Sequence, residues 1–188
     1  AAIPLLLQSY LDNLVPERHP ELRAMETAAA AEGFPIIGPA CGHVCYLIAR
    51  MIGARRIFEL GSGFGYSTAW LARALRENGG GEVHHTVWDA ALSAQARRHL
   101  TAMELADLVQ FHCAEAIGVL REQSDTFDLI FSDIDKEDYP ASLEVIEDRL
   151  RPGGVLIVDN MLWGNRIFDP AIDDPATRGV RRFTRMIG

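Results

Sequence analysis

Short apolar segments alternate along the chain with segments of helical periodicity, and this alternation constrains the fold more than any other feature. The apolar segments are 55–60, 82–88, 108–113, 127–133 and 154–160. Apolar residues at helical spacing follow the first four of them, at 66–78, 90–105, 114–123 and 139–150. Nearly continuous apolar strands separated by helices predict an α/β fold, with a mostly parallel sheet covered by helices on both faces.

The length of 188 residues and a hydrophobic content of 48 % predict a single domain, 1–188, with one continuous core. Residues 1–52 read as helical throughout, with breaks at Pro16, Pro20 and 33–39, and are expected to form a lid or dimer segment. Residues 53–188 are then the core that carries the ligand sites.

Composition excludes several classes of partner. With 18 basic and 26 acidic residues the net charge is -8, which disfavours nucleic acid and favours a small molecule. The apolar runs are too short to span a membrane, and the N-terminal stretch lacks the basic start of a signal peptide. Cys41, Cys45 and Cys113 form neither a CxxC pair nor an even disulfide set, so we expect buried thiols in a soluble, cytoplasmic protein.

Acidic or amide residues stand at or just after the carboxyl end of every predicted strand. Because ligands of open parallel sheets bind outside the carboxyl ends of the strands, these residues are the candidates for a ligand cleft. They are Glu59, Asp89, Glu115, Asp133 with Asp135, and Asp159 with Asn160.

A glycine-rich loop follows the first of these strands, with Gly61, Gly63 and Gly65 shortly after Glu59. The dinucleotide fingerprint G-x-G-x-x-G fails here, because its third glycine would stand at Tyr66. The acid before the glycines also disfavours a phosphate. A ligand with a cationic centre and hydroxyl groups fits better, and S-adenosylmethionine has both; a tight turn without a ligand is the alternative.

Three motifs together resemble the cation-dependent O-methyltransferases of the catechol and caffeoyl-coenzyme A type. The first motif comprises Glu59, Gly61, Gly65, Tyr66 and Ser67. The second comprises Phe127, Asp128, Phe131, Asp133, Asp135, Lys136 and Tyr139. The third comprises Gly153, Gly154, Asp159, Asn160, Leu162 and Trp163. The resemblance spans about residues 20 to 185 and implies a Rossmann-like S-adenosylmethionine methyltransferase fold. Members of this family are often dimeric, so the resemblance also implies a homodimer.

The resemblance also implies roles for individual residues. Asp133, Asp159 and Asn160 would hold a divalent cation, Lys136 would be the catalytic base, and Trp163 would lie against the ring of a phenolic substrate. The methyl donor would be lined by Glu59, Gly61, Ser67, Ala116 and Asp135.

The proposed cation ligands also make chemical sense from their types alone. Two carboxylates and an amide oxygen suit Mg²⁺, Mn²⁺ or Ca²⁺ and leave positions for two neighbouring oxygens of a catechol. A coordinated hydroxyl ionises more readily, which supplies a nucleophile for methylation. The alternative for Asp133 and Asp159 is helix capping or turn formation, for which Asp is a common residue.

The chain departs from the family pattern at three places. Val87 stands where the family has an acid for the ribose of the donor, and Asp89, two residues on, is the candidate substitute. Cys113 to Glu115 stand where Gly and Asp are common. The chain ends at Gly188, before two further strands of the family fold, so these strands are expected to be absent.

Two hypotheses follow. The first is an enzyme that methylates a vicinal dihydroxy aromatic, favoured by the complete set of cation ligands with Lys136. The second is a catalytically degenerate protein that binds S-adenosylmethionine, suggested by Val87 and the short C-terminus. The six histidines lack ligand spacing and are interpreted as structural. The basic run 178–185 is interpreted as a solvated helix face or a contact for an anionic partner.

Overall fold

The computed structural model describes residues 5–188 and contains the predicted parallel sheet. Its five strands lie in the order β3-β2-β1-β4-β5, and every neighbouring pair is parallel. They are β1 (Arg56–Leu60), β2 (Glu82–Thr86), β3 (Val109–His112), β4 (Phe127–Ser132) and β5 (Leu150–Val158). The prediction of an α/β fold with five strands is therefore confirmed.

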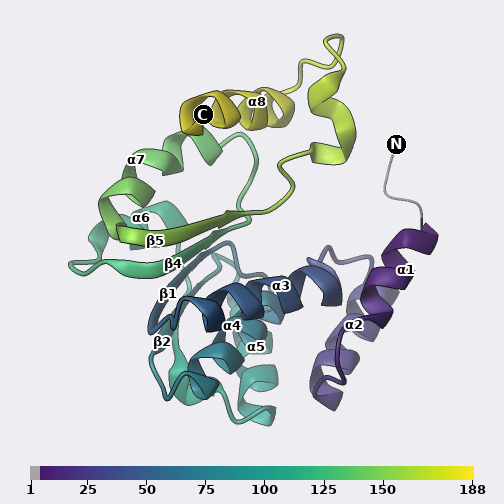
Figure 1. The fold of residues 1–188 in the computed structure, drawn as a ribbon, viewed down its shortest axis with the longest axis vertical. Coiled ribbons are helices and arrows are strands. Elements are labelled where there is room, and N and C mark those ends of the chain that lie inside the picture. The colour runs from purple at the N-terminus through teal and green to yellow at the C-terminus, as the bar shows by residue number, and fades with distance from the viewer. Residues whose placement is uncertain (1–4) are drawn as a thin grey trace.

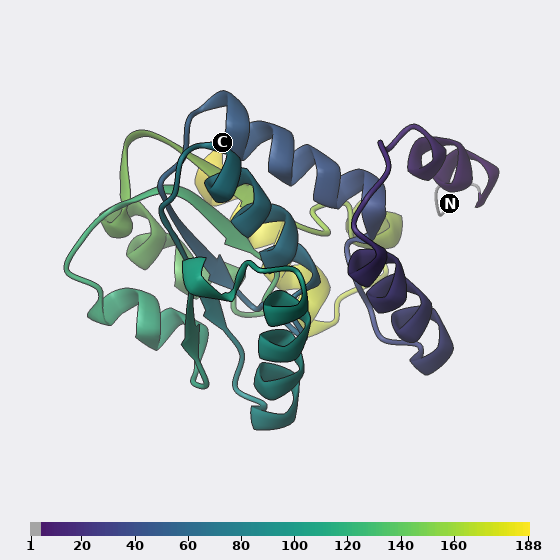
Figure 2. The same ribbon diagram turned by 90° about the horizontal axis from the view of Figure 1, so that it is seen from below.

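Helices connect the strands and cover both faces of the sheet (Figure 1, Figure 2). Those of the core are α4 (Tyr66–Glu77), α5 (Ala90–Ala102), α6 (Ala116–Glu122), α7 (Tyr139–Arg149) and α8 (Pro175–Ile187), with short 3₁₀ helices η1 (Ala106–Leu108) and η2 (Trp163–Phe168). Within residues 5–188 no helix is long and apolar enough to cross a membrane.

The core consists of one apolar cluster on each face of the sheet. Neighbouring residues of a strand point to opposite faces, so Ile57 joins the cluster under α4 and α5, while Phe58 joins the cluster under α6 and α7. The adjacent His84 and His85 divide in the same way. His84 packs against Phe58, and His85 lies on the other face. His84 and His85 thus point to opposite faces of the sheet, and their interpretation as structural residues stays a prediction.

Strand β5 begins earlier than the sequence predicts. The residues Arg151 to Gly154 suggest a stop, yet the strand runs through them from Leu150. The register with β4 is irregular here, because Leu150 pairs with Phe127 and Val155 with Leu129. Among the described strands β5 has a neighbour on one side, so Pro152 can lie within it without removing a needed ladder donor.

The N-terminal segment forms α1 (Leu5–Asn13), α2 (Pro20–Glu32) and α3 (Gly38–Met51), as predicted. Helix α1 lies at the periphery (Figure 1), where the Asp12 carboxylate accepts a hydrogen bond from Ala40 N at the start of α3. Leu6, Leu7, Tyr10 and Leu14 are exposed apolar residues in and just after α1. The predicted helical segment starts at residue 1, and Ile3 lies outside the described residues.

Candidate functional site

The chain leaves β1 toward both edges of the sheet, through β2 and β3 on one side and β4 and β5 on the other. Such a switch point creates a crevice at the carboxyl ends of the strands. Two adjoining cavities lie there, of about 420 and 550 Å³. Both are lined by Pro35, Ile36, Asp133, Ile134 and Asp135. We call them the glycine-loop cavity and the acidic cavity.

The glycine loop is held to the end of β2 by buried hydrogen bonds. The Thr86 hydroxyl donates to Glu59 O at 2.7 Å and accepts from Gly61 N at 3.3 Å. Thr86 N donates to Ser62 Oγ at 3.0 Å, and Ser62 N donates to Thr86 O at 2.9 Å. This reciprocal pairing fixes the backbone that begins the glycine-loop cavity.

Gly61 also connects the loop to β4. Its φ is +82°, and a Cβ atom there would lie 2.5 Å from the carbonyl oxygen of Asp133. Asp133 N in turn donates to Leu60 O at 2.8 Å. A side chain at position 61 would therefore displace Asp133, which belongs to both cavities.

Glu59 lies beneath the loop and is fully buried, so the structure does not bring it to the surface of either cavity. Its Oε2 accepts a hydrogen bond of 2.5 Å from Thr68 Oγ1, which lies 3.0 Å from His85 Nδ1. Its Oε1 is buried without a hydrogen-bond partner among the described residues. Burial raises the pKa of Glu59 above its usual value, against the opposing effect of the hydroxyls of Ser67, Thr68 and Ser62. The geometry makes Glu59 a support beneath the loop; its direct contact with a donor stays a prediction.

Most of the other residues assigned to the donor do line the glycine-loop cavity. They are Gly61, Gly63, Ser67, Ala116 and Asp135. Gly65 lies outside the lining and is the residue before α4, where its φ of +93° lets the loop turn into the helix close to Ala96.

The end of β2 differs from the expectation for Asp89. Asp89 Oδ1 caps α5 by accepting from Ala91 N at 2.7 Å and Leu92 N at 3.0 Å. Asp89 is absent from the cavity lining, whereas Val87 and Trp88 are part of it. The structure therefore places an apolar side chain, not the carboxylate of Asp89, at this wall.

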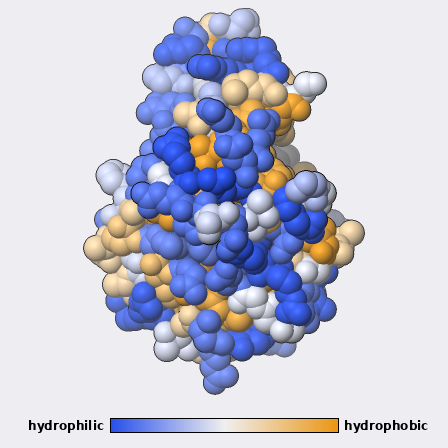
Figure 3. Space-filling view, turned by 90° about the vertical axis from the view of Figure 1, so that its left-hand side faces the viewer, coloured by the Kyte–Doolittle hydropathy of each residue, from blue (hydrophilic) through white to orange (hydrophobic). Residues whose placement is uncertain are grey.

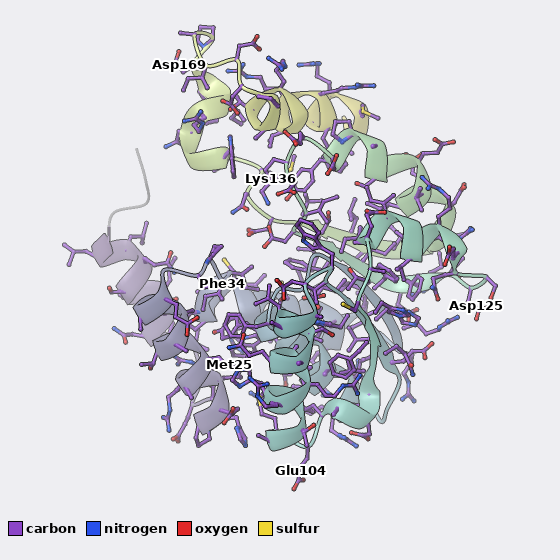
Figure 4. The ribbon with its side chains drawn as sticks, turned by 180° about the vertical axis from the view of Figure 1, so that it is seen from behind. Met25, Phe34, Glu104, Asp125, Lys136 and Asp169 are labelled. Carbon is purple, nitrogen blue, oxygen red and sulfur yellow. The ribbon has the colours of Figure 1, made fainter. Side chains whose placement is uncertain are left out.

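The acidic cavity brings together the predicted cation ligands Asp133, Asp159 and Asn160 with Lys136 and Trp163. Asp133 follows β4 and its N donates to Leu60 O of β1, while Asp159 follows β5 and its N donates to Ser132 O of β4. These hydrogen bonds bring both residues to the same edge of the sheet. Lys136 Nζ donates to Asp133 Oδ1 at 2.7 Å and to Ile134 O at 3.0 Å. Figure 4 shows Lys136 between the C-terminal elements and the rest of the domain.

The charge of this cavity favours a cation. Burial raises the pKa of Asp133, the hydrogen bond from Lys136 lowers it, and the nearby Asp159 raises it again. Asn160 adopts a φ of +57°, a conformation that Asn tolerates better than most residues. Two carboxylates that repel each other, with an amide beside them, fit a hard divalent cation. No group of three His, Cys, Asp or Glu side chains arranged for a metal occurs in residues 5–188; the set with Asn160 is of a different composition.

Lys136 and Trp163 form one wall of the acidic cavity. Lys136 Nζ lies 5.0 Å from the centre of the Tyr139 ring and 5.9 Å from that of Trp163. The indole nitrogen of Trp163 is buried without a hydrogen-bond partner among the described residues. A half-buried aromatic ring beside an amino group can contact a flat, polar ligand.

Sequence reasoning missed the contribution of the α2–α3 linker. Phe34 to Ile37 line the glycine-loop cavity, and the Phe34 ring would lie 3.3 Å from a Cβ atom at Gly63. Phe34 also packs edge-on against Phe64, with ring centres 5.0 Å apart; Figure 4 shows it beside the N-terminal helices. The sequence marked this linker as a break between helices, which locates the segment but not its contacts.

A second missed contact connects α2 to the start of α4. Tyr66 Oη donates to Glu26 Oε1 at 2.7 Å, and Arg18 pairs with both oxygens of Glu26 at 2.7 Å. Burial raises the pKa of Tyr66, and the hydrogen bond to Glu26 raises it further. The N-terminal segment is thus bound directly to a residue that lines the glycine-loop cavity.

Comparison with known proteins identifies relatives along almost the whole chain. A family model described as a methyltransferase domain matches residues 58–161. The catechol O-methyltransferase of Niastella koreensis is 32% identical over 185 residues, which cover 95% of this chain and 83% of that protein.

Solved structures agree with this result. The O-methyltransferase TomG from Streptomyces achromogenes, in complex with SAM, has a TM-score of 0.86 and 32% identity, covering 96% of this chain and 83% of that one. The O-methyltransferase from Bacillus cereus, in complex with SAH, has a TM-score of 0.87 and 31% identity, covering 97% and 84%. These similarities confirm the predicted Rossmann-like fold.

Proposed function

This chain belongs to the S-adenosylmethionine-dependent O-methyltransferases, and we propose that it methylates one hydroxyl of a small vicinal dihydroxy aromatic with the help of a divalent cation. The observation that carries the proposal is the pair of adjoining cavities that share Asp133 and Asp135. The glycine-loop cavity would bind the methyl donor. The acidic cavity has oxygen ligands for a cation, which would in turn bind the acceptor.

In this proposal the donor lies in the glycine-loop cavity. The bare backbone at Gly61 and Gly63 permits close approach, and the Ser67 hydroxyl and Asp135 carboxylate supply polar contacts. The linker residues Phe34 to Ile37 also line this cavity, with Phe34 beside Gly63, and would exclude water from the donor.

Asp133, Asp159 and Asn160 would hold the cation, because they place two carboxylates and one amide in a single cavity. A divalent cation bound there would orient two neighbouring hydroxyl groups and lower the pKa of the one to be methylated. The residues around it then position the acceptor against the donor, which is the main requirement of a transfer between two bound molecules.

Lys136 is the candidate base, because its amino group lies at the wall of the acidic cavity and reaches Asp133. Trp163 lines the same cavity and would contact the acceptor ring. Replacing Lys136 with Ala should retain cation binding and lower the rate about 10² to 10⁴-fold if Lys136 acts as a general base.

The test is methylation of a panel of ortho-diphenols and matched monophenols, with Mg²⁺ and then with a chelator. We expect turnover with the diphenols, its loss in the chelator, and recovery on adding Mg²⁺, Mn²⁺ or Ca²⁺. Equal turnover of monophenols would reject the vicinal diol. Full activity in the chelator would reject the cation.

A catalytically degenerate binding protein is the alternative, favoured by the apolar Val87 in the wall of the glycine-loop cavity. Calorimetric titration with S-adenosylmethionine separates the two. Donor binding without turnover on any acceptor would support the degenerate protein, whereas turnover excludes it.

We further propose that α1 contributes to a homodimer. Leu6 is 86% exposed and Leu14 62%, and a helix of this length is marginal in water without a partner. Leu6→Glu should convert a dimer into monomers in sedimentation velocity, whereas Met186→Glu on α8 should leave it intact. A wild-type protein that is already monomeric would contradict the proposal.

A cytoplasmic setting is proposed from the cysteines. Cys41, Cys45 and Cys113 are free thiols in the structure. Cys45 is buried as expected, whereas Cys41 and Cys113 are exposed, so the expectation of three buried thiols is wrong for these two. Burial raises the pKa of the Cys45 thiol to about 12, which keeps it protonated and unreactive.

A further inference from the structure

A basic groove lies between α7 and α8. It encloses about 660 Å³, within the size range of small-molecule sites. Residues of the first turn of α7 form one wall and the arginines of α8 form the other. The basic residues that line it are Arg178, Arg181, Arg182 and Arg185. Helix α8 is drawn in yellow above the sheet in Figure 1, and the corresponding upper part of Figure 3 is predominantly hydrophilic.

Two of these arginines already have partners. Arg178 pairs with Asp173 at 3.2 Å. Arg181 donates to the carbonyl oxygens of four residues before α8, including Ile167 at 3.0 Å and Ile172 at 2.8 Å. Arg182 and Arg185 are exposed and have neither a hydrogen bond nor an ion pair with any described residue. The groove thus has two guanidinium groups available for a ligand.

The spacing of the arginines is unfavourable without an anion. Along α8 they form like-charge pairs three and four residues apart, which destabilise a helix. The groove contains two acidic residues, Glu137 and Asp173, against four arginines, although the chain as a whole carries a net charge of -8. Positive charge is therefore concentrated in this groove, and the described residues neutralise only part of it.

We propose that this groove binds a multiply charged anion of the phosphate type, held by Arg182 and Arg185 with support from Arg178. Planar guanidinium groups recognise phosphate oxygens in a bidentate manner, and three of them at positions i, i+4 and i+7 lie on one helix face. The site is separate from the donor and cation sites proposed above. It does not depend on the proposed reaction.

The groove nevertheless borders the acidic cavity. Glu137 lines both, and a Cβ atom at Gly179 of α8 would lie 2.1 Å from the carbonyl oxygen of Lys136. The anion can therefore come from two sources, either a free phosphate compound or a phosphate group attached to the acceptor.

The experiment titrates the protein with inorganic pyrophosphate by calorimetry and follows its melting temperature, with sodium chloride at equal ionic strength as the reference. We expect saturable binding and a higher melting temperature in the wild type. The double variant Arg182→Gln/Arg185→Gln should weaken binding at least tenfold. The matched control Arg98→Gln/Arg121→Gln removes the same charge from exposed arginines of α5 and α6 and should bind within twofold of wild type.

Two outcomes would overturn the site: pyrophosphate binding that sodium chloride reproduces, or equal binding by both double variants. The source is decided by comparing KM for a neutral ortho-diphenol and for one with a phosphate ester side chain. A rise in KM for the phosphorylated acceptor alone in Arg182→Gln/Arg185→Gln assigns the groove to the acceptor. Unchanged KM values with weakened pyrophosphate binding assign it to a free anion. Because pyrophosphate binding is measured without turnover, it holds or fails independently of the proposed methylation.

Discussion

The two sides of the switch point are built differently. On the glycine-loop side, Thr86 and Ser62 are buried and exchange hydrogen bonds with the loop backbone. On the acidic side, Asp159 is followed by Asn160 and then by η2, where Trp163, Gly164 and Asn165 also have positive φ values. The first side is a closed network of buried groups, and the second is a half-buried loop lined with charge.

This difference indicates which side depends on a ligand for its order. In the glycine loop Gly61 N, Ser62 N and Gly65 N all donate hydrogen bonds within the protein, so we expect the shape of this part of the loop to be set before a donor binds. The carboxylates Asp133 and Asp159 repel each other, and of the two only Asp133 has Lys136 as a hydrogen-bonded partner among the described residues. The acidic side should therefore gain most from a bound cation, and the predictions below test this contrast.

The largest effect is expected for Asp159→Asn, which removes one carboxylate from the proposed cation set at nearly constant volume. Cation-dependent turnover should fall on the order of 10³-fold, since a bound cation contributes several kcal/mol to such reactions. Donor affinity, measured by calorimetry, should stay within about twofold because the glycine-loop network is untouched. Asp148→Asn, at the exposed end of α7, is the matched control and should behave as wild type. Loss of donor binding in Asp159→Asn would show that the two sides are not independent.

Acid should weaken the glycine-loop side first. Burial lowers the pKa of His85 to about 3, and burial also lowers the pKa values of His84 and His112. These histidines are neutral in the folded protein, whereas in the unfolded chain they take up a proton near pH 6.5. The free energy of unfolding is therefore highest above about pH 6.5 and falls as the pH decreases toward 3. At about 1.4 kcal/mol per pKa unit, the loss is on the order of several kcal/mol.

Hydrogen exchange followed by mass spectrometry at pH 7, 5.5 and 4.5 checks this order. Peptides from β2 and β3 should lose protection before those from β4 and β5, because all six histidines precede residue 113. Simultaneous loss across the sheet, or earlier loss in β5, would contradict it.

Thr86→Val should cost roughly tenfold in donor affinity. The substitution keeps the shape but leaves Glu59 O without its hydroxyl donor and Gly61 N without its acceptor, and a buried unpaired group costs about 1 to 3 kcal/mol. Thr86→Ser keeps the hydroxyl and should restore most of the affinity in the same titration. If Thr86→Val binds the donor as wild type does, the loop is not positioned by this hydrogen bond.

The sequence predicted the features that depend on neighbouring residues. The strands, the glycine loop and the polar residues after each strand are local patterns, and parallel pairing brings all strand ends to one edge. This is why Asp133, Asp159 and Asn160 could be placed together before the structure was known.

The missed features depend on contacts between distant segments. Thr86 reaches the loop from another strand, Phe34 covers Gly63 from the N-terminal segment, and Glu26 accepts from Tyr66 forty residues away. Residues Arg151 to Gly154 look like a turn in the sequence, although they belong to β5. Local turn preference cannot show that this strand lies at the edge of the sheet, where Pro152 is tolerated. Similarly, Asp89 does lie near the end of a strand, as predicted. Its carboxylate, however, accepts hydrogen bonds from the unpaired backbone N–H groups at the start of α5.

The smallest effect is expected for Val87→Glu. This substitution tests whether a new polar group on the glycine-loop side can bind the donor. Val87 lines the glycine-loop cavity, and its backbone is held by the hydrogen bond from Val87 N to His112 O at 3.1 Å. A carboxylate there can accept from a donor hydroxyl, which should tighten S-adenosylmethionine binding by about 1 kcal/mol, or roughly fivefold. Val87→Gln, of similar size but uncharged, should give a smaller gain in the same calorimetric titration. Weaker binding of Val87→Glu than of Val87→Gln would mean that repulsion from Asp133 and Asp135 exceeds the gain from the new hydrogen bond, and that the charge of the acidic side reaches across the shared wall.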